Sequence, residues 1–319
     1  MARGLVEGIL ARDRGLLARA ISLVEAEGAD GDELYRQVCS LRRDSPIVAF
    51  TGPPGVGKST LVGAYIGYLR REGKTVAVAA VDPSSPLSGG AILGDRLRMV
   101  EHDGDEGVFI RSLASRGQAG GLSAALYRVA DVLSAAAYDV VIVETVGSGQ
   151  VDVAVADVAD VKVVVGAPGL GDHVQAIKAG ILEIADILVL NKADTPHAEQ
   201  AFGQLEAMLK LRAKSARDVP VVATIATLKS GIPELAAAIG ARLTVDKLTD
   251  RPARDRDRAR KLLAQAAARA VMDHIAQERS AHLARICDEV ATGRASFTAA
   301  TAEVIGMIAK TVITAQGRT

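Results

Sequence analysis

Residues 47–69 read IVAFTGPPGVGKSTLVGAYIGYL, and this segment sets the architecture of the 319-residue chain. A short run of β-branched and apolar residues leads into a glycine-rich turn, and helix-forming residues follow. The turn matches the pattern G-x-x-x-x-G-K-S/T from Gly52 to Ser59. Glycines in this pattern let backbone N–H groups turn inward around phosphate oxygens at a helix N-terminus, where the helix dipole also favours negative charge. The segment therefore predicts a strand, a phosphate-binding loop and a helix, in that order.

Two side chains of this loop have expected chemical roles. Lys58 is expected to reach the β- and γ-phosphates of a nucleotide, and Ser59 to supply a hydroxyl ligand to Mg²⁺. Mg²⁺ prefers octahedral oxygen ligation and usually keeps several waters, so one protein hydroxyl beside phosphate oxygens suits it. The expected nucleotide-binding residues here are Gly52, Pro53, Pro54, Gly55, Val56, Gly57, Lys58, Ser59 and Thr60.

The remaining apolar runs predict the fold class. Runs this apolar are typical of strands covered on both faces, so we expect an α/β fold with a mostly parallel central sheet flanked by helices. The expected strands are 47–51, 75–81, 108–110, 140–143, 161–165, 187–190 and 219–224. The expected helices between them are 58–71, 121–136, 174–184, 195–211 and 232–243.

Both ends of the chain carry helical patterns instead. Apolar residues at helical spacing predict a helical N-terminal extension over 1–44, followed by a nucleotide-binding domain over 45–248. After Arg251–Pro252 the strand pattern stops, and two helices are expected at about 253–291 and 297–315. A helical region of this length, 249–319, predicts packing against a second subunit and hence a homodimer.

Composition excludes several classes of protein. Lys and Arg together number 38, as do Asp and Glu, so no excess charge predicts binding to nucleic acid or an anionic membrane. The basic tract 251–261 is interrupted by Asp255 and Asp257 and lacks aromatic residues, which favours a solvated helix start. Charged residues interrupt the apolar runs, so neither a membrane span nor a secretory signal is expected. Cys39 and Cys287 lie far apart, which indicates a reducing, cytoplasmic location.

Base recognition is predicted from Asn191-Lys192-Ala193-Asp194, directly after the expected strand 187–190. A carboxylate at Asp194 can accept two hydrogen bonds, from guanine N1–H and the 2-amino group. Adenine has no such pair of donors and would leave the carboxylate unpaired, a strong basis for discrimination. We therefore expect GTP and GDP as ligands.

Further acidic residues are candidates for the metal and catalytic shell. Glu144 and Gly147 follow the expected strand 140–143, where an acid can hold the metal through water and a glycine N–H can meet the γ-phosphate. Asp82 and Asp95 bracket a polar, Gly- and Pro-rich segment. This segment is either a switch ordered by Mg²⁺ and the γ-phosphate or a long surface loop with incidental acids.

Two more places are candidate switches. Arg111 and Arg116 lie in or near a glycine-rich segment, where an arginine can stabilise transition-state charge. Asp172 and Lys178 follow the expected strand 161–165 and are read either as a helix N-cap with a surface lysine or as a further nucleotide-responsive segment.

Taken together, GPPGVGKST, VDPSSPLSGGAILGDRLRM, FIRSLASRGQAGGLS, ETVGSGQ, PGLGDHVQAIKAGILEIAD and NKAD occur in this order. Over about residues 5–245 the chain resembles the MeaB/ArgK-type G-proteins associated with methylmalonyl-CoA mutase. The resemblance implies a P-loop NTPase fold and a homodimeric GTPase. It also implies a chaperone role, in which the GTPase binds an adenosylcobalamin-dependent acyl-CoA mutase, gates cofactor loading and protects the mutase.

The resemblance also implies roles for individual residues. Lys58 and Ser59 bind phosphate and Mg²⁺, and the metal and catalytic shell comprises Asp82, Asp95 and Glu144. Asn191, Lys192 and Asp194 bind guanine, while Asp172 and Lys178 form a third switch that senses the partner.

The chain departs from the family pattern at Gln118-Ala119, at Val151-Asp152 and at Ile225, which stands where the family has a serine before Ala226. The Ala226 backbone N–H is still expected to donate to guanine. These departures lie near switches and the base, so the client is either methylmalonyl-CoA mutase or a related mutase.

Two other functions share some of these features. An ATP-driven transport ATPase or kinase would also use a phosphate loop, but Asp194 argues for guanine. A nickel-insertion GTPase would need imidazole or thiolate ligands, and the five histidines show no metal-binding spacing.

Overall fold

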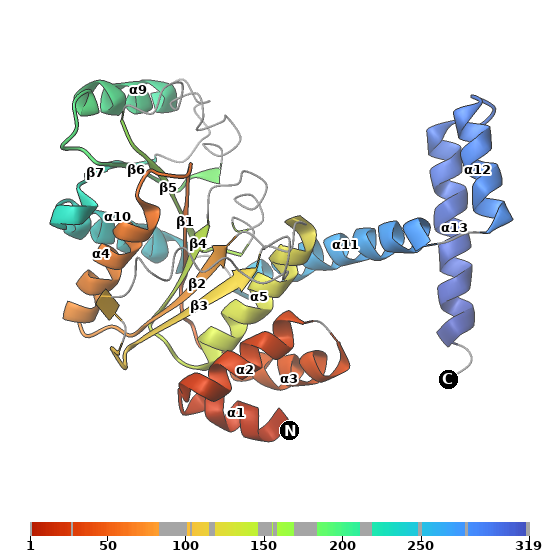
Figure 1. The fold of residues 1–319 in the computed structure, drawn as a ribbon, viewed down its shortest axis with the longest axis horizontal. Coiled ribbons are helices and arrows are strands. Elements are labelled where there is room, and N and C mark those ends of the chain that lie inside the picture. The colour runs from red at the N-terminus through yellow and green to blue at the C-terminus, as the bar shows by residue number, and fades with distance from the viewer. Residues whose placement is uncertain are drawn as a thin grey trace. The chain divides into compact units, whose positions relative to one another are not determined.

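The computed structural model of the chain divides into two compact units, Met1–Arg258 and Ala259–Thr319. Figure 1 shows its helices and strands. The structure describes residues 2–26, 28–82, 101–102, 104–114, 119–145, 155, 158–168, 184–210, 219–247, 251–277 and 280–316.

A seven-stranded sheet forms the centre of the first unit (Figure 1). Its strand order is β3-β2-β4-β1-β5-β6-β7, and every neighbouring pair is parallel, so all carboxyl ends lie at one edge. The predicted α/β fold with a parallel sheet is confirmed. The strands are β1 (Ile47–Thr51), β2 (Val76–Asp82), β3 (Val108–Ala114), β4 (Val140–Thr145), β5 (Val161–Gly166), β6 (Ile187–Asn191) and β7 (Val221–Thr224).

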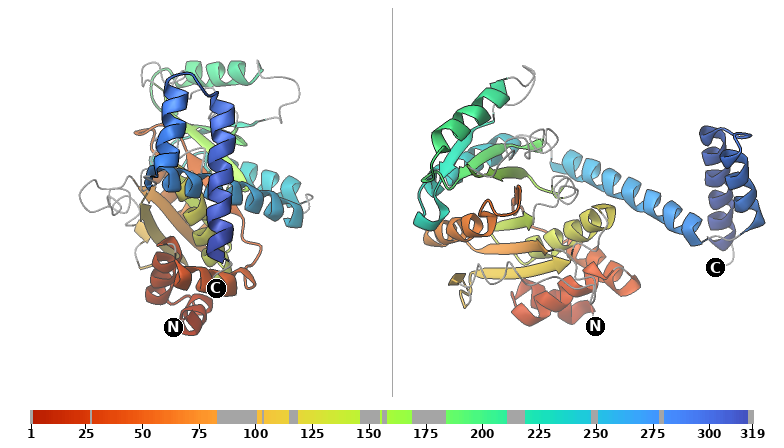
Figure 2. Two further views of the ribbon diagram at one scale, coloured as in Figure 1. Left: turned by 90° about the vertical axis from the view of Figure 1, so that its right-hand side faces the viewer. Right: turned by 45° about the horizontal axis from the view of Figure 1, so that its top comes forward.

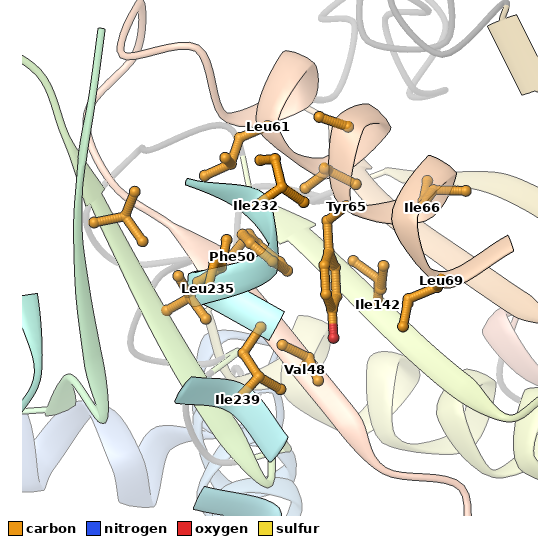
Figure 3. Close-up of a cluster of buried hydrophobic side chains, with 14 of the residues drawn as sticks. Val48, Phe50, Leu61, Tyr65, Ile66, Leu69, Ile142, Ile232, Leu235 and Ile239 are labelled. Carbon is orange, nitrogen blue, oxygen red and sulfur yellow. The ribbon is translucent and has the colours of Figure 1, made fainter. Parts of the chain in front are cut away.

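Helices cover both faces of this sheet because its strands are apolar on both sides. On one face, α4 (Lys58–Arg71) and α10 (Ile232–Lys247) pack on side chains from the middle strands. On the other face lie α5 (Ala119–Ala135) and α9 (Ala198–Lys210). Figure 3 shows the first of these cores, in which strand residues meet both helices: Val48, Phe50, Ile142, Leu61, Tyr65, Ile66, Leu69, Ile232, Leu235 and Ile239.

Three N-terminal helices pack against α5 and belong to the same compact unit as the sheet: α1 (Ala2–Leu10), α2 (Arg14–Glu25) and α3 (Ala29–Cys39). Figure 2 shows them gathered on one side of the sheet. Arg12 links these helices to the segment after α5. Its Nε donates to the Ala136 carbonyl oxygen at 2.9 Å, and its guanidinium carbon lies 4.7 Å from the centre of the Tyr138 ring. The helices of residues 1–44 therefore pack within the same compact unit as the sheet.

A buried polar cluster joins α3 to α5. Asp131 of α5 is 5% exposed and accepts a hydrogen bond from the Tyr35 hydroxyl at 2.7 Å. Arg42 Nη1 lies 3.2 Å from the other oxygen of the same carboxylate. Burial, and then the neighbouring Asp131 carboxylate, raise the pKa of the Tyr35 hydroxyl. The N-terminal layer is thus held by charge-assisted hydrogen bonds as well as by apolar contacts.

The second unit contains the end of α11 (Arg251–Gln277), together with α12 (Ala281–Ala291) and α13 (Phe297–Gln316). Figure 2 shows α12 and α13 side by side, and Leu283, Ile286, Ala300 and Val304 form their small core. The expectation of one helix over 253–291 is wrong. Ser280 begins a new helix because its side chain accepts from the Leu283 N–H at 3.3 Å and caps α12.

The expected helix at 174–184 lies almost wholly outside the described residues. Within the described part of the chain, no helix combines the length and apolar character needed to cross a membrane.

A candidate nucleotide-binding site

The phosphate loop connects β1, in the middle of the sheet, to the N-terminus of α4. Gly52 leaves β1 with φ at +141°, and a Cβ there would lie 2.1 Å from the Val165 carbonyl oxygen of β5. Gly57 precedes α4 with φ at +90°, in the left-handed region. Since side chains are disfavoured at both places, the loop needs glycine to leave the strand and to enter the helix. Its backbone is thereby directed to the carboxyl edge of the sheet.

Lys58 occupies the first turn of α4 and is 6% exposed. Its Nζ donates to the carbonyl oxygens of Gly52 at 2.8 Å and Pro53 at 2.9 Å. These bonds satisfy a buried ammonium that would otherwise be costly. The ammonium and the positive end of the α4 dipole are thus concentrated at one loop, which is the charge distribution that phosphate groups require.

A buried hydroxyl and carboxylate meet beside the same loop. Ser59 Oγ donates to Glu144 Oε1 at 2.6 Å, and the two residues are 3% and 1% exposed. Glu144 lies near the end of β4, in register with Phe50 of β1. The ends of β1 and β4 also carry hydroxyls, those of Thr51 and Thr145. Thr145 Oγ1 donates to Thr51 Oγ1 at 3.1 Å. This corner of the sheet therefore presents hard oxygen ligands next to the phosphate loop.

The carboxamide of Asn191, at the end of β6, links the phosphate loop to the last strand. Its Nδ2 donates to the Val56 carbonyl oxygen at 2.9 Å. Its Oδ1 accepts from the Ala226 backbone N–H and from Thr224 Oγ1, each at 3.1 Å. The N–H of Ala226, predicted to donate to guanine, is therefore bonded to Asn191 in this structure.

Residues 192–195 form a tight turn next to the phosphate loop. Lys192 has φ at +59°, and its Nζ donates to the Gly55 carbonyl oxygen at 2.8 Å. The Ala193 N–H donates to the Thr224 carbonyl oxygen at 3.1 Å, and the Thr195 hydroxyl donates to the Lys192 carbonyl oxygen at 2.8 Å. Between these anchors the side chain of Asp194 is exposed, where it is accessible to a ligand.

The remaining predicted residues are described only in part. Asp82 ends β2 in register with Ala114, and only its backbone is described. Arg111 Nη2 donates to Ser22 Oγ of α2 at 2.8 Å, so its guanidinium contacts the N-terminal layer. Outside the described residues lie Asp95, Arg116, Gly147, Asp172 and Lys178.

Sequence reasoning did not single out three buried threonines of this site: Thr51, Thr145 and Thr224. Each of them ends a strand at the carboxyl edge. The available signal is a hydroxyl closing an otherwise apolar strand, which is weak because threonine also has high β propensity.

A parallel sheet whose central strand enters a glycine-rich loop, followed by a helix with a buried lysine at its first turn, defines a P-loop nucleoside triphosphatase. The profile of the family described as methylmalonyl Co-A mutase-associated GTPase MeaB matches residues 17–280. The chain belongs to this family, and it is a GTPase that binds guanine nucleotides.

Relatives and a solved structure agree with this assignment. A Pyrococcus abyssi protein named as a GTPase is 48% identical over 235 residues, which is 72% of each chain. GTPase ArgK of Escherichia coli K12 is 41% identical over 236 residues, 71% of each chain. The crystal structure of a LAO/AO transport system kinase superposes with a TM-score of 0.75 at 27% identity, covering 96% of this chain and 97% of that one.

Proposed function

We propose that this GTPase is a chaperone of an adenosylcobalamin-dependent acyl-CoA mutase, either methylmalonyl-CoA mutase or a relative of it. In this role it gates cofactor loading and protects the mutase from inactivation. Support comes from the family, whose description names association with methylmalonyl-CoA mutase. The site supports the nucleotide part of the proposal, because the phosphate loop and the Asn191–Asp194 segment meet through direct hydrogen bonds. The two cysteines are both free, which fits the cytoplasm.

Guanine recognition is assigned to the turn at Asp194. Its exposed carboxylate would accept from N1–H and the 2-amino group of guanine, and adenine would leave it unpaired. Asn191 and Lys192 would hold this turn against the phosphate loop through their bonds to Val56 and Gly55. Base and phosphates would then be bound by one connected structure.

Mg²⁺ fits the residues beside the loop. Ser59 Oγ and Glu144 Oε1 are buried hard oxygen atoms 2.6 Å apart, a donor type that Mg²⁺ prefers. In the part of the chain that the structure describes, no three His, Cys, Asp or Glu side chains form a metal-ligand group. The ion is therefore proposed to bind through Ser59 and the nucleotide phosphates, with Glu144, Asp82 and Asp95 around it. When bound, Mg²⁺ would neutralise charge on the phosphate oxygens.

Hydrolysis is proposed to be slow in the isolated protein and faster with its client. The fixed groups, Lys58 and Ser59, bind and orient the nucleotide, and transition-state stabilisation is electrostatic. Arg116, Asp172 and Lys178 are proposed to respond to the γ-phosphate and to the mutase. Arg111 is proposed for the same set, although its described contact is with Ser22 of α2.

The second unit is proposed to form a homodimer. The pair α12–α13 has only a small core, and it exposes the large apolar side chains Phe297, at 79%, and Ile305, at 54%. A second copy of this chain is the proposed occupant of that surface. Light scattering should give the mass of a dimer for the full chain and a lower mass for Ile305→Glu; a monomeric wild-type protein would contradict the proposal.

The observation that carries the proposed function is the junction of phosphate loop and Asn191–Asp194 segment, and calorimetry tests its nucleotide part. We expect the Mg²⁺-loaded protein to bind GDP tightly and ADP not detectably. A preference for ADP would instead favour an ATP-driven transport ATPase or kinase, the function for which the similar LAO/AO transport system kinase is named.

The chaperone part is tested with purified methylmalonyl-CoA mutase from the same cell. Added mutase should raise the GTPase rate of the wild-type protein, and GTP should change the loading of adenosylcobalamin onto the mutase. Lys58→Ala is the control, because it should abolish both effects while the chain stays folded. If GDP binds but neither effect appears with this mutase or a related acyl-CoA mutase, the client assignment is wrong, and a nickel-insertion role becomes the next to test.

A further inference from the structure

Two side chains in the turn before β3 attach that turn to α4. His102 Nε2 lies 2.9 Å from the Gly63 carbonyl oxygen, in the second turn of α4. A carbonyl oxygen can only accept, so Nε2 carries the proton in this contact. Near the other end of α4, Arg70 Nε and Nη2 donate to the two carboxylate oxygens of Asp105, each at 2.9 Å. We call His102, Asp105 and Arg70 the α4 clasp.

The α4 clasp has a defined geometry because its backbone and side chains fit one another. Asp105 Oδ1 also accepts from the Gly107 N–H at 2.8 Å, and Arg70 Nη1 donates to the Lys74 carbonyl oxygen at 2.8 Å. A Cβ on Gly107 would lie 2.2 Å from Arg70 Cζ, so a side chain there would displace the guanidinium. Paired N–H donors of one arginine fix direction as well as distance. Because the side chains of Arg70 and Asp105 are 27% and 31% exposed, their ion pair contributes modest stability, and its main effect is geometric.

The α4 clasp and the phosphate loop share one helix. The first turn of α4 carries Lys58 and Ser59, and the clasp holds the turn before β3 against the later turns. The stretch of sequence between Asp82 and Glu101 therefore starts at β2, which pairs with β3, and ends next to a residue attached to α4. Asp95, which is proposed to stand around Mg²⁺, belongs to this stretch and lies outside the described residues.

We propose that His102 and Asp105 are positioning residues for the Mg²⁺ site, because they anchor the end of the stretch that carries Asp95 on the helix that carries Ser59. The inference rests on the proposed role of Asp95 and Ser59 in holding the ion. Without the clasp, the chain after Asp95 would next be anchored at β3, and further residues would have to be ordered when the ion binds. The added loop length costs little by itself, whereas ordering the backbone costs more. The clasp is therefore expected to affect the binding of Mg²⁺ and not the phosphate loop.

The test measures by calorimetry the binding of guanylyl imidodiphosphate, a GTP analogue that is not hydrolysed, with Mg²⁺ and with a chelator. The ratio of the two affinities is the Mg²⁺ enhancement. In His102→Ala the enhancement should fall roughly 5- to 10-fold, the effect of ordering about one further residue, and the affinity without Mg²⁺ should not change. Asp105→Ala should also lower the enhancement, and it replaces His102→Ala if that variant does not fold by circular dichroism.

Two further variants separate positioning from general damage to the turn. His102→Gln keeps a nitrogen donor for the Gly63 carbonyl oxygen, so its enhancement should stay near the wild-type value. Glu101→Gln is the matched control from the neighbouring position. Its carboxylate lies 3.9 Å from Lys229 Nζ, and both side chains are mostly exposed, so this pair contributes little. Glu101→Gln should bind the analogue as the wild type does.

The decisive comparison places His102→Ala in an Asp95→Asn background. If the clasp acts through Asp95, the second substitution should lower the enhancement no further. A loss of structure unrelated to Asp95 would instead add its own effect. The comparison therefore separates a positioning role from a purely structural one.

Three outcomes overturn the inference: an unchanged enhancement in His102→Ala, a His102→Gln variant that behaves like His102→Ala, or a full further loss in the Asp95→Asn background. These outcomes leave the proposed Mg²⁺ site intact, provided that Asp95→Asn alone lowers the enhancement. If Asp95→Asn has no effect, or if the wild type shows no enhancement, the proposed metal shell itself is wrong, and the inference about the clasp is overturned with it.

Discussion

Replacing Asp131 with alanine is expected to destabilise the first unit by about 3 kcal/mol. The carboxylate is 5% exposed and accepts a hydrogen bond from the Tyr35 hydroxyl at 2.7 Å, and a charge-assisted bond of this kind contributes ~1.5–3 kcal/mol. The ion pair with Arg42 adds no more than about 1 kcal/mol, because the arginine side chain is 23% exposed. Alanine also relieves part of the cost of burying a charge, which lowers the sum.

Urea denaturation followed by far-ultraviolet circular dichroism measures this loss directly. Glu206→Ala, an exposed carboxylate on α9, is the control and should change the free energy of unfolding by less than about 0.5 kcal/mol. In a double-mutant cycle, Asp131→Ala and Tyr35→Phe should show a coupling energy of about 1–2 kcal/mol. A loss below about 1 kcal/mol, or additive effects of the two substitutions, would refute the idea that this cluster fastens α3 to α5.

Four other predictions concern the nucleotide site and pH. Lys58→Ala should abolish tight GTP binding in calorimetry without unfolding the chain, and unchanged affinity would contradict the phosphate-loop assignment. Asp194→Asn should weaken the binding of GDP selectively. Equal losses of affinity for GDP and ADP would count against Asp194 as the residue that contacts guanine. Because burial raises the pKa of Tyr35 above its ordinary value near 10, stability should fall as pH rises beyond about 10, and less steeply in Tyr35→Phe. The hydrogen bond from Arg70 lowers the pKa of Asp105, so the contribution of the ionised Asp105 carboxylate to stability is present above about pH 4 and is lost below it. If the free energy of unfolding of Asp105→Asn depends on pH in the acid range as steeply as that of the wild type, this prediction is wrong.

The sequence predicts the strands of the sheet well because glycines and prolines mark the boundaries between strands and helices clearly. Expected strand 47–51 and helix 58–71 coincide with β1 and α4, since glycines and prolines separate them. The third expected strand is too short, at 108–110 instead of Val108–Ala114. Arg111 and Ser112 interrupt its apolar pattern, but an edge strand tolerates polar residues on its less covered positions.

Long-range contacts account for what the pattern does not predict. The attachment of the N-terminal helices depends on Arg12, Tyr35 and Asp131, which are far apart in sequence and unremarkable as residue types. At the nucleotide site, motifs predict Lys58, Ser59 and the Asn191–Asp194 segment. They do not predict the hydrogen bond from Thr224 to Asn191, because this contact depends on β7 lying beside β6, and strand order is not encoded in a local pattern.

The packing of the N-terminal helices on α5 also limits where a shortened form of this protein can begin. On α5, Tyr127 and Ala135 are buried on the same side as Asp131, which contacts Tyr35 of α3, and a protein started at residue 45 would present this side of the helix to water. Exposed apolar surface of that kind promotes association between copies. A catalytic fragment designed on the phosphate loop and the Asn191–Asp194 segment alone should therefore aggregate, whereas one that begins with α1 should remain dispersed.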